Sequence, residues 1–196
     1  MKICVDVKKM EEMEKMGETL DRNKPTLGVI SDVHGDVETT ARAFDEFEKR
    51  GVERVICCGD LGDLEILDVF RRIPTDFVAG NCDARRREAL AVEIPKIGGR
   101  FWGDFGETEW AGKRIFFTHG HGRLEDRIDD EAYSELWDLI CFGHSHRFET
   151  RRYKKTLILN PGAIQPRGEK PCCVVLDADL RIERVFPATL SFWSFV

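Results

Sequence analysis

The chain has 196 residues, 42% hydrophobic and 34% charged, a size that predicts one domain able to bury a core without disulfide bonds or a structural metal. Thirty basic and 36 acidic residues give a net charge of −6, which argues against a nucleic-acid coat or a polybasic membrane binder because both need a basic face. No apolar stretch approaches the ~20 residues of a membrane span, and the densely charged N-terminal region is unlike a signal peptide, so we expect a soluble, cytoplasmic protein.

Residues 1–25 are expected to form an N-terminal extension. Lys2 to Val7 alternates like a short strand, and Lys8 to Leu20 places three methionines and a leucine on one helical face. The simplest interpretation is a strand and a helix that pack on the domain. A docking surface for a second subunit or a partner is the alternative. Residues 26–196 then form the main domain.

From residue 26 onward, the pattern predicts βα units followed by antiparallel strands. Residues 92–118 mark the change, because their alternating runs are broken by glycines in the manner of antiparallel hairpins. The predicted helices span residues 37–50, 64–72 and 124–136. The predicted strands span residues 26–31, 53–58, 75–79, 138–142, 148–153, 156–160, 172–177 and 181–186. Together these elements predict an α/β core of two sheets with flanking helices.

The seven cysteines show no C-x-x-C spacing. The adjacent pairs at 57–58 and 172–173 lie in apolar runs, and we interpret them as small buried side chains in a reducing compartment. Cys82 differs because it lies in the polar string GNCD. It therefore belongs with the candidate site and not with the core.

The five histidines lie in three glycine-rich strings, SDVHGD, THGHG and FGHSHR. These strings, and also GDLGD and GNCD, each follow a predicted strand directly. Loops at the carboxyl ends of strands build the sites of α/β folds, and glycine lets the backbone turn sharply there. The side chains that we expect to converge as metal ligands are Asp32, His34, Asp60, Asn81, His119, His144 and His146.

Oxygen and nitrogen donors without a required thiolate suit manganese, iron or zinc. Asp32 and His34 are two residues apart, as are His144 and His146, so both members of a pair can face one ion. Two ions about 3.5–4 Å apart would form the two-metal clamp of phosphate-ester hydrolysis. Alternatives are histidines that only cap loops, and a zinc site of Cys141 with the last two histidines. That zinc site would leave Asp32, His34 and Asp60 unexplained.

The order of these strings resembles the calcineurin-like metallophosphoesterase superfamily. The short length, GNCD in place of GNHD, and NPGA at residues 160–163 resemble its small prokaryotic phosphodiesterase branch. The resemblance covers about residue 26 to the end of the chain. It implies a four-layer α/β/β/α sandwich of two mixed sheets flanked by helices.

The resemblance also implies how the ligands are shared. One metal would be held by Asp32, His34, Asp60 and His146. The second metal would be held by Asp60, Asn81, His119 and His144, so that Asp60 bridges the two ions. Two divalent ions are implied, manganese first, with nickel, iron, zinc and magnesium as alternatives.

The charges of such a centre predict phosphoester hydrolysis by a hydroxide that bridges two cations, because the metals lower the pKa of bound water towards ~7. His121 fits no ligand position, and we expect it to contact the substrate phosphate or to orient a ligand. Cys82 stands where the wider superfamily has a histidine thought to assist the leaving group, and a thiol with a pKa of about 8.5 is a poor proton donor. With Asp83, which completes GNCD, these two residues are the catalytic candidates. We therefore expect a small phosphodiester as the substrate, in preference to a monoester.

A non-catalytic protein-binding scaffold of the same fold is the alternative function. The retromer scaffold subunit is similar in its HGH and NPG strings but departs at the bridging aspartate and at the asparagine, whereas Asp60 and Asn81 are intact here. The N-terminal extension and the C-terminal SFWSFV support the protein-binding alternative, because both are candidates for exposed apolar surface. Either segment is also a candidate contact between copies of the chain. Residues 85–87, three arginines, predict a solvated helix start or a phosphate-recruiting patch.

Overall fold

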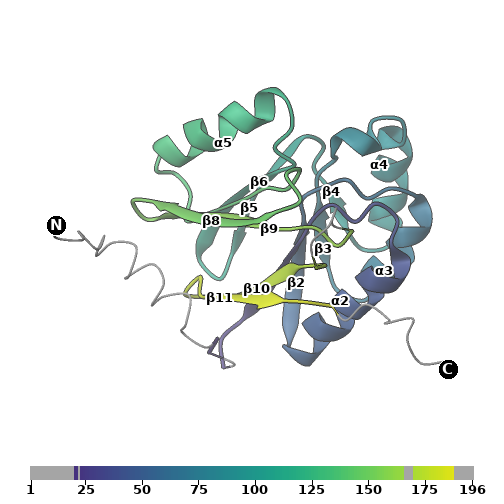
Figure 1. Cartoon of the computed structure of the whole chain (residues 1–196), viewed down its shortest axis with the longest axis horizontal. Helices are drawn as coiled ribbons and strands as arrows, with labels where there is room; N and C mark the ends of the chain where they lie inside the picture. The colour runs from purple at the N-terminus through teal and green to yellow at the C-terminus, as the bar shows by residue number, and fades with distance from the viewer. Residues whose placement is uncertain (1–19, 22, 166–169, 188–196) are drawn as a thin grey trace, which may run out of the picture.

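The computed structural model describes residues 20, 21, 23–165 and 170–187. The strand and helix predicted within the N-terminal extension lie outside these residues, apart from Leu20 at the end of the helix, and so does the C-terminal SFWSFV segment. Figure 1 shows two stacked sheets with helices on their outer faces.

The described part of the chain contains two mixed sheets. In the first sheet the strands are, in order across it, β11 (Ile182–Val185), β10 (Cys173–Asp177), β1 (Thr26–Ile30), β2 (Val52–Cys57), β3 (Thr75–Phe77) and β4 (Arg100–Phe101). In the second they are β5 (Phe105–Trp110), β6 (Lys113–Thr118), β7 (Leu139–Cys141), β9 (Thr156–Pro161) and β8 (Phe148–Tyr153). Strands β1 to β4 run parallel to one another, and so do β6, β7 and β9. In each sheet, the carboxyl ends of these strands therefore lie at the same edge.

Helices cover the outer face of each sheet. The helices are α2 (Val37–Lys49), α3 (Leu67–Phe70), α4 (Arg87–Lys96) and α5 (Arg123–Tyr133), with short 3-10 turns η1 (Leu64–Ile66) and η2 (Asn81–Asp83). Helix α2 begins at the N-cap Asp36, whose carboxylate accepts the Thr39 N–H at 2.9 Å, and it stops before Gly51, where φ is +68°. Both ends of this helix lie within a residue of the prediction.

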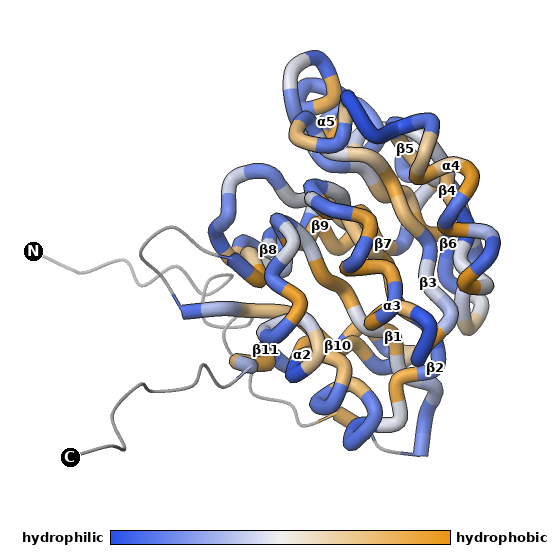
Figure 2. The backbone as a smooth tube through the Cα atoms, turned by 90° about the vertical axis from the view of Figure 1, so that its right-hand side faces the viewer, coloured by the Kyte–Doolittle hydropathy of each residue, from blue (hydrophilic) through white to orange (hydrophobic). Residues whose placement is uncertain are grey.

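Three apolar layers separate the sheets and helices. Between the sheets, Leu27 of β1 and Ile56 of β2 share one fully buried cluster with Phe117 of β6 and Leu159 of β9. Outside the first sheet, α2, α3 and α4 bury a second cluster, and outside the second sheet Ile128 of α5 belongs to a third. Figure 2 shows that many residues along the strands are hydrophobic. The predicted four-layer α/β/β/α sandwich is confirmed.

The prediction of antiparallel hairpins throughout residues 92–118 is wrong in its first part. The first residues of that range belong to α4, and β4 pairs parallel with β3. Within this range, β5 and β6 form the antiparallel hairpin, which turns at residues 111–112. Pro95 lies inside α4 and weakens its helical pattern, but Leu90 and Ile94 are fully buried. Tertiary packing therefore stabilises a helix that the local pattern does not specify.

Two predicted helices are shorter than expected. Residues 64–72 divide into the η1 turn and the single turn of α3. Helix α5 ends at Tyr133, because Glu135 takes a left-handed φ of +56° that an α-helix does not continue through. Leu136, predicted to face inward on this helix, is 49% exposed.

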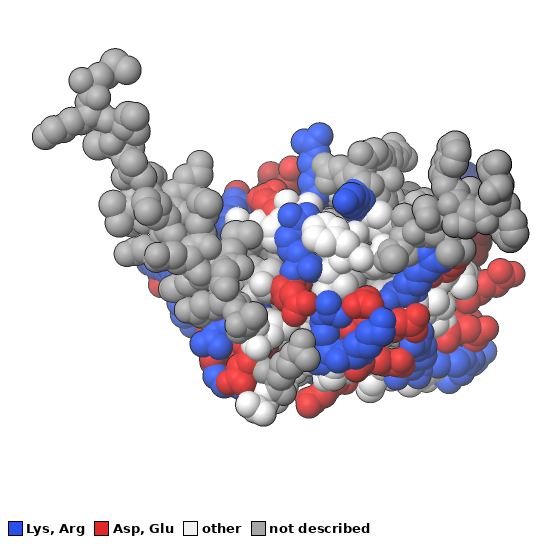
Figure 3. All heavy atoms as spheres, turned by 60° about the horizontal axis from the view of Figure 1, so that its bottom comes forward, with Lys and Arg blue, Asp and Glu red and all other residues white. Residues whose placement is uncertain are grey.

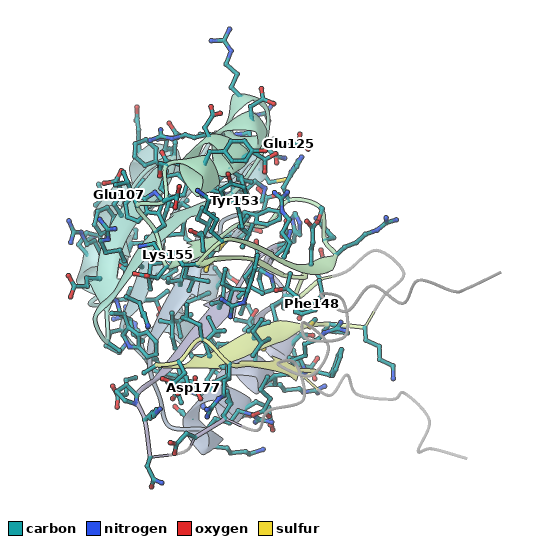
Figure 4. The ribbon with its side chains drawn as sticks, turned by 90° about the vertical axis from the view of Figure 1, so that its left-hand side faces the viewer. Glu107, Glu125, Phe148, Tyr153, Lys155 and Asp177 are labelled. Carbon is teal, nitrogen blue, oxygen red and sulfur yellow. The ribbon has the colours of Figure 1, made fainter. Side chains whose placement is uncertain are left out.

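Aromatic contacts hold the edge strand β8 in place, through its first and last residues, Phe148 and Tyr153, which are labelled in Figure 4. Tyr153 packs edge-on against Tyr133 of α5, with 4.9 Å between ring centroids. Phe148 lies under the guanidinium of Arg184 from β11, 4.0 Å from the ring centroid. The first contact joins α5 to its sheet, and the second joins the edges of the two sheets.

One face of the molecule mixes charges of both signs. Basic and acidic side chains are interspersed on the face in Figure 3. Such a face lacks the single-signed field that recruits nucleic acid. Among the described residues, no helix has the length and apolar character needed to cross a membrane.

Candidate metal centre

The loops that follow β1, β2, β3, β6 and β7 meet where the two sheets approach each other. The Asp32 N–H donates to the Gly59 carbonyl at 3.0 Å, and the Gly143 N–H donates to the His119 carbonyl at 3.1 Å. Gly143 also packs so tightly on the β1 loop that a Cβ there would lie 1.9 Å from Ser31 Oγ. Glycine is therefore required at 143 for the loops of the two sheets to touch.

One group of donors combines Asp32, His34 and His146, whose ligand atoms lie within 4.8 Å of one another. His146 Nε2 lies 3.3 Å from Asp32 Oδ1 and 3.2 Å from His34 Nε2. Asp32 is fully buried, and its Oδ1 has no hydrogen-bond partner. A buried carboxylate oxygen without a partner is costly, and a cation would satisfy it. These residues therefore fit a divalent ion.

A second group is centred on Asp60 and His119. His119 Nε2 lies 3.4 Å from Asp60 Oδ2 and 3.2 Å from Asn81 Oδ1. The opposite ring nitrogen, Nδ1, donates to the Cys58 carbonyl at 2.7 Å, which leaves Nε2 free to bind a metal. Asp60 Oδ2 is also 3.8 Å from His34 Nε2. Asp60 thus lies between the two groups, as a bridging ligand must.

His144 and His121 lie beside the second group. The ring of His144 is 5.2 Å from that of His119, centroid to centroid, but it belongs to none of the close donor groups among the described residues. The ring of His121 is 5.4 Å from that of His119 and 6.2 Å from that of His144. His121 Nδ1 is buried without a hydrogen-bond partner. The centre therefore holds one imidazole more than the predicted ligand set.

The backbone is strained at most of the predicted ligands. Positive φ angles occur at Asp32 (54°), His34 (48°), Asp60 (55°), His144 (68°) and His146 (61°). Such a conformation costs of order 1–3 kcal/mol for a residue other than glycine, and it persists where the surrounding structure imposes it. The concentration of strain in these loops marks them as a functional site.

The charges at the centre attract a cation. Burial raises the pKa of Asp60, but the His119 imidazole and the Cys82 N–H lower it more, so the net shift is well below the usual range. Burial lowers the pKa of His119, and the Asp60 carboxylate overcomes this and raises it. For the Cys82 thiol, partial desolvation and the same carboxylate raise the pKa to about 11. Without a bound cation, this thiol is protonated at neutral pH.

Asp83, predicted as a catalytic residue, accepts hydrogen bonds from backbone N–H groups of two neighbouring loops. Its fully buried carboxylate accepts the N–H groups of Leu61 at 3.0 Å, Gly62 at 3.2 Å and Gly80 at 2.8 Å. It thereby joins the loop after β2 to the loop after β3. We interpret Asp83 as a positioning residue for Asp60 and its neighbours.

Asp83→Asn is expected to destabilise the protein by about 1–3 kcal/mol, because the amide NH₂ cannot accept the N–H groups that the carboxylate now satisfies. Denaturant unfolding would measure the change. The matched control is Asp63→Asn, which removes an exposed pair with Arg86 and is expected to cost less than about 1 kcal/mol. Equal stability of the two variants would contradict the positioning role.

Asn160, the first residue of the NPGA string, has no role predicted from the sequence. The buried Asn160 amide donates to the Gly143 carbonyl at 2.7 Å and to Ser145 Oγ at 3.1 Å. These bonds fix the loop that carries His144 and His146. An asparagine directly before Pro-Gly at the end of a buried strand was the available signal.

The three arginines after Cys82 are not a free basic patch. Arg86 pairs with Asp63, and Arg87 pairs with Asp104 and begins α4. Two of the three charges are therefore balanced locally. The geometry agrees with the predicted helix start.

The four-layer sandwich and the aspartate and histidine donors at its strand ends define a metallophosphoesterase fold. The calcineurin-like phosphoesterase superfamily domain matches residues 26–181, and the chain belongs to this family of hydrolases that act on phosphoester bonds. The family and the enzyme class predicted from the sequence are confirmed.

Two of the curated proteins similar to this chain are named as phosphoesterases. The chain is 29% identical over 139 residues to phosphodiesterase MJ0936 of Methanocaldococcus jannaschii, an alignment that covers 69% of this chain and 82% of that protein. It is 31% identical over 169 residues to the probable metallophosphoesterase YsnB of Bacillus subtilis, covering 81% and 88%.

Solved structures share the fold. A structure of an archaeal phosphodiesterase superposes with a TM-score of 0.72 at 24% identity, covering 82% of this chain and 99% of that one. Vps29 of Chaetomium thermophilum superposes with a TM-score of 0.58 at 21% identity, covering 78% and 82%. The fold by itself therefore does not distinguish a phosphodiesterase from Vps29. The distinction must come from the metal-ligand side chains of the site.

Proposed function

We propose that the protein is a phosphodiesterase that depends on two divalent metal ions. The observation that carries the proposal is the unpartnered, buried Asp32 oxygen facing His34 and His146, beside the second group around Asp60. The proposed ligands of the first ion are Asp32, His34, Asp60 and His146. The proposed ligands of the second ion are Asp60, Asn81, His119 and His144. The oxygen and nitrogen donors support manganese, with nickel, iron, zinc and magnesium as alternatives.

Two bound ions would supply an activated water at neutral pH and neutralise charge on the phosphoryl oxygens. Asp60 holds both positions together through one carboxylate. His121, whose ring lies 5.4 Å from that of His119, would contact the substrate phosphate or orient a ligand. Cys82 lies exposed beside Asp60, and its weakly acidic thiol gives little help to a departing oxygen. This favours activated diesters over ordinary monoesters, and the similar protein MJ0936 is named a phosphodiesterase.

Metal analysis combined with hydrolysis of bis-p-nitrophenyl phosphate in Mn²⁺ tests the proposal. We expect two ions per chain and hydrolysis that a chelator abolishes. One ion per chain would refute the dinuclear centre. A chain that binds two ions but does not hydrolyse the diester would favour the alternative function, a protein-binding scaffold, which needs no nucleophile.

Activity and metal content are expected to fall together as the pH drops through the histidine range, because a protonated imidazole cannot bind a metal. The pKa of His119 is raised in the free chain, so its charged form is favoured until the pH exceeds that raised value. A bound cation competes with this proton and moves the apparent midpoint below about 6.5. Rates and metal content measured between pH 4 and pH 8 in saturating Mn²⁺ test this, and a flat profile would exclude histidine ligands.

We also propose a cytoplasmic location and a small phosphoester as the partner. The described cysteines are all unbonded, which supports a reducing compartment. Association of copies through the N-terminal extension or through SFWSFV involves residues outside the described part of the chain and stays a prediction.

A further inference from the structure

We infer that Cys82 is a ligand for soft divalent cations such as Cd²⁺ and Zn²⁺, in a nitrogen, oxygen and sulfur site that it shares with His34 and Asp60. One donor atom of each side chain lies within 4.8 Å of the other two. The inference rests on the metal centre proposed above and adds a sulfur donor that the manganese centre does not use.

The spacing of these donors suits a tetrahedral ion. Metal–ligand distances of about 2.0–2.3 Å place tetrahedral donors about 3.3–3.8 Å apart. His34 Nε2 and Asp60 Oδ2 are already 3.8 Å apart. The Cys82 backbone is fixed next to the same carboxylate, because its N–H donates to Asp60 Oδ1 at 2.8 Å. Rotation of side chains alone can therefore close the site.

A separate observation points to a cation at this position. The buried Asp32 Oδ1, which has no hydrogen-bond partner, lies 4.0 Å from His34 Nε2. An unsatisfied carboxylate oxygen thus borders the three-donor group and offers a fourth ligand. The four donors would give two carboxylates, one imidazole and one thiolate.

The thiol is accessible and chemically suited to a soft ion. Among the described cysteines, Cys82 is the exposed one, and the others are buried. Thiolates prefer soft cations, whereas Mn²⁺ prefers oxygen ligands. On binding, the S–H bond breaks, a sulfur–metal bond forms and the proton passes to solvent. Two classes of ion would therefore bind the same centre through different ligand sets.

Cadmium titration of the full chain, freed of metals and followed by the ultraviolet thiolate-to-cadmium charge-transfer band, tests this inference. Cys4→Ser serves as the parent, so that a thiol outside the described residues does not contribute. We expect the parent to give a band that saturates as the centre fills. Adding Cys82→Ser should abolish the band and weaken Cd²⁺ binding about 10–100-fold. Mn²⁺ affinity should change by less than about threefold, because the thiolate is not its ligand.

Each of four outcomes would overturn the inference. A parent that binds Cd²⁺ without a thiolate band would leave the metal centre standing but exclude Cys82 from it. A band that persists in Cys82→Ser would assign the sulfur to a buried cysteine. Equal losses of Cd²⁺ and Mn²⁺ affinity would show a general effect on the centre. Failure of both ions to bind the parent would refute the proposed centre itself.

Discussion

Asp60→Asn is expected to remove both metal ions and to lower the rate of diester hydrolysis by at least about 10³-fold, which corresponds to about 4 kcal/mol of lost transition-state stabilisation. The reason is the position of this carboxylate, 3.4 Å from His119 Nε2 and 3.8 Å from His34 Nε2. A neutral amide cannot bridge two cations as a carboxylate does. Loss of one side chain should therefore empty two sites.

The substitution is conservative in shape, so it isolates the charge. Asp60 has a φ of +55°, and asparagine is among the residues that tolerate this region best. The amide oxygen can still accept the Cys82 N–H, which now reaches Asp60 Oδ1 at 2.8 Å. We expect the variant to fold with a thermal midpoint close to that of the metal-free parent.

Metal analysis of the purified variant measures the effect, with His146→Gln as the matched control. His146 belongs to one donor group only, so that control is expected to lose about one ion and retain the other. Asp60→Asn should lose both. Unchanged metal content in Asp60→Asn, or equal losses in the two variants, would contradict the bridging role.

The prediction of fold from sequence succeeded where apolar pattern and burial coincide. Strand β1 is buried at every position, and β8 spans the predicted residues 148–153. It failed at α4, because Pro95 and a weak apolar pattern conceal a helix that depends on the burial of Leu90 and Ile94. The local sequence pattern does not indicate that these two side chains are buried by tertiary contacts.

The sequence predicts which residues make up the candidate site. It does not predict the backbone hydrogen bonds that hold these residues in place. Glycine-flanked aspartates and histidines after successive strands indicated one site, and the structure brings them together. The positive φ angles at the ligands and the backbone contacts of Asp83 could not be read from residue type. By residue type, Asp83 is a plausible acid or base. Its hydrogen bonds from three backbone N–H groups show that it joins the loop after β2 to the loop after β3.

Cys82→His is expected to raise turnover of monoesters with poor leaving groups by up to about 10²–10⁴-fold, and that of nitrophenyl esters much less. The thiol now at this position has its pKa raised to about 11, so it is a weak acid. An imidazolium with a pKa of about 6.5 gives up its proton far more readily. Nitrophenolate departs without protonation, so it gains little from an added acid.

The position suits a proton donor. The backbone N–H of Cys82 is fixed to Asp60, and its side chain is exposed at the start of η2. A larger ring therefore has room to emerge beside the centre without displacing the core. Cys82→Gln is the matched control, because glutamine is similar in size to histidine but donates no titratable proton. It should leave the ratio of monoester to diester turnover unchanged.

The ratio of turnover on a poor leaving group to turnover on its nitrophenyl counterpart is the decisive measurement, because it cancels changes in the amount of active protein. Metal content must be checked, since a new imidazole beside Asp60 could itself bind an ion. If Cys82→His keeps its metals and its fold and the ratio stays that of Cys82→Gln, position 82 does not protonate the leaving group. Protonation would then come from His121, whose Nδ1 lacks a partner, or from bulk water.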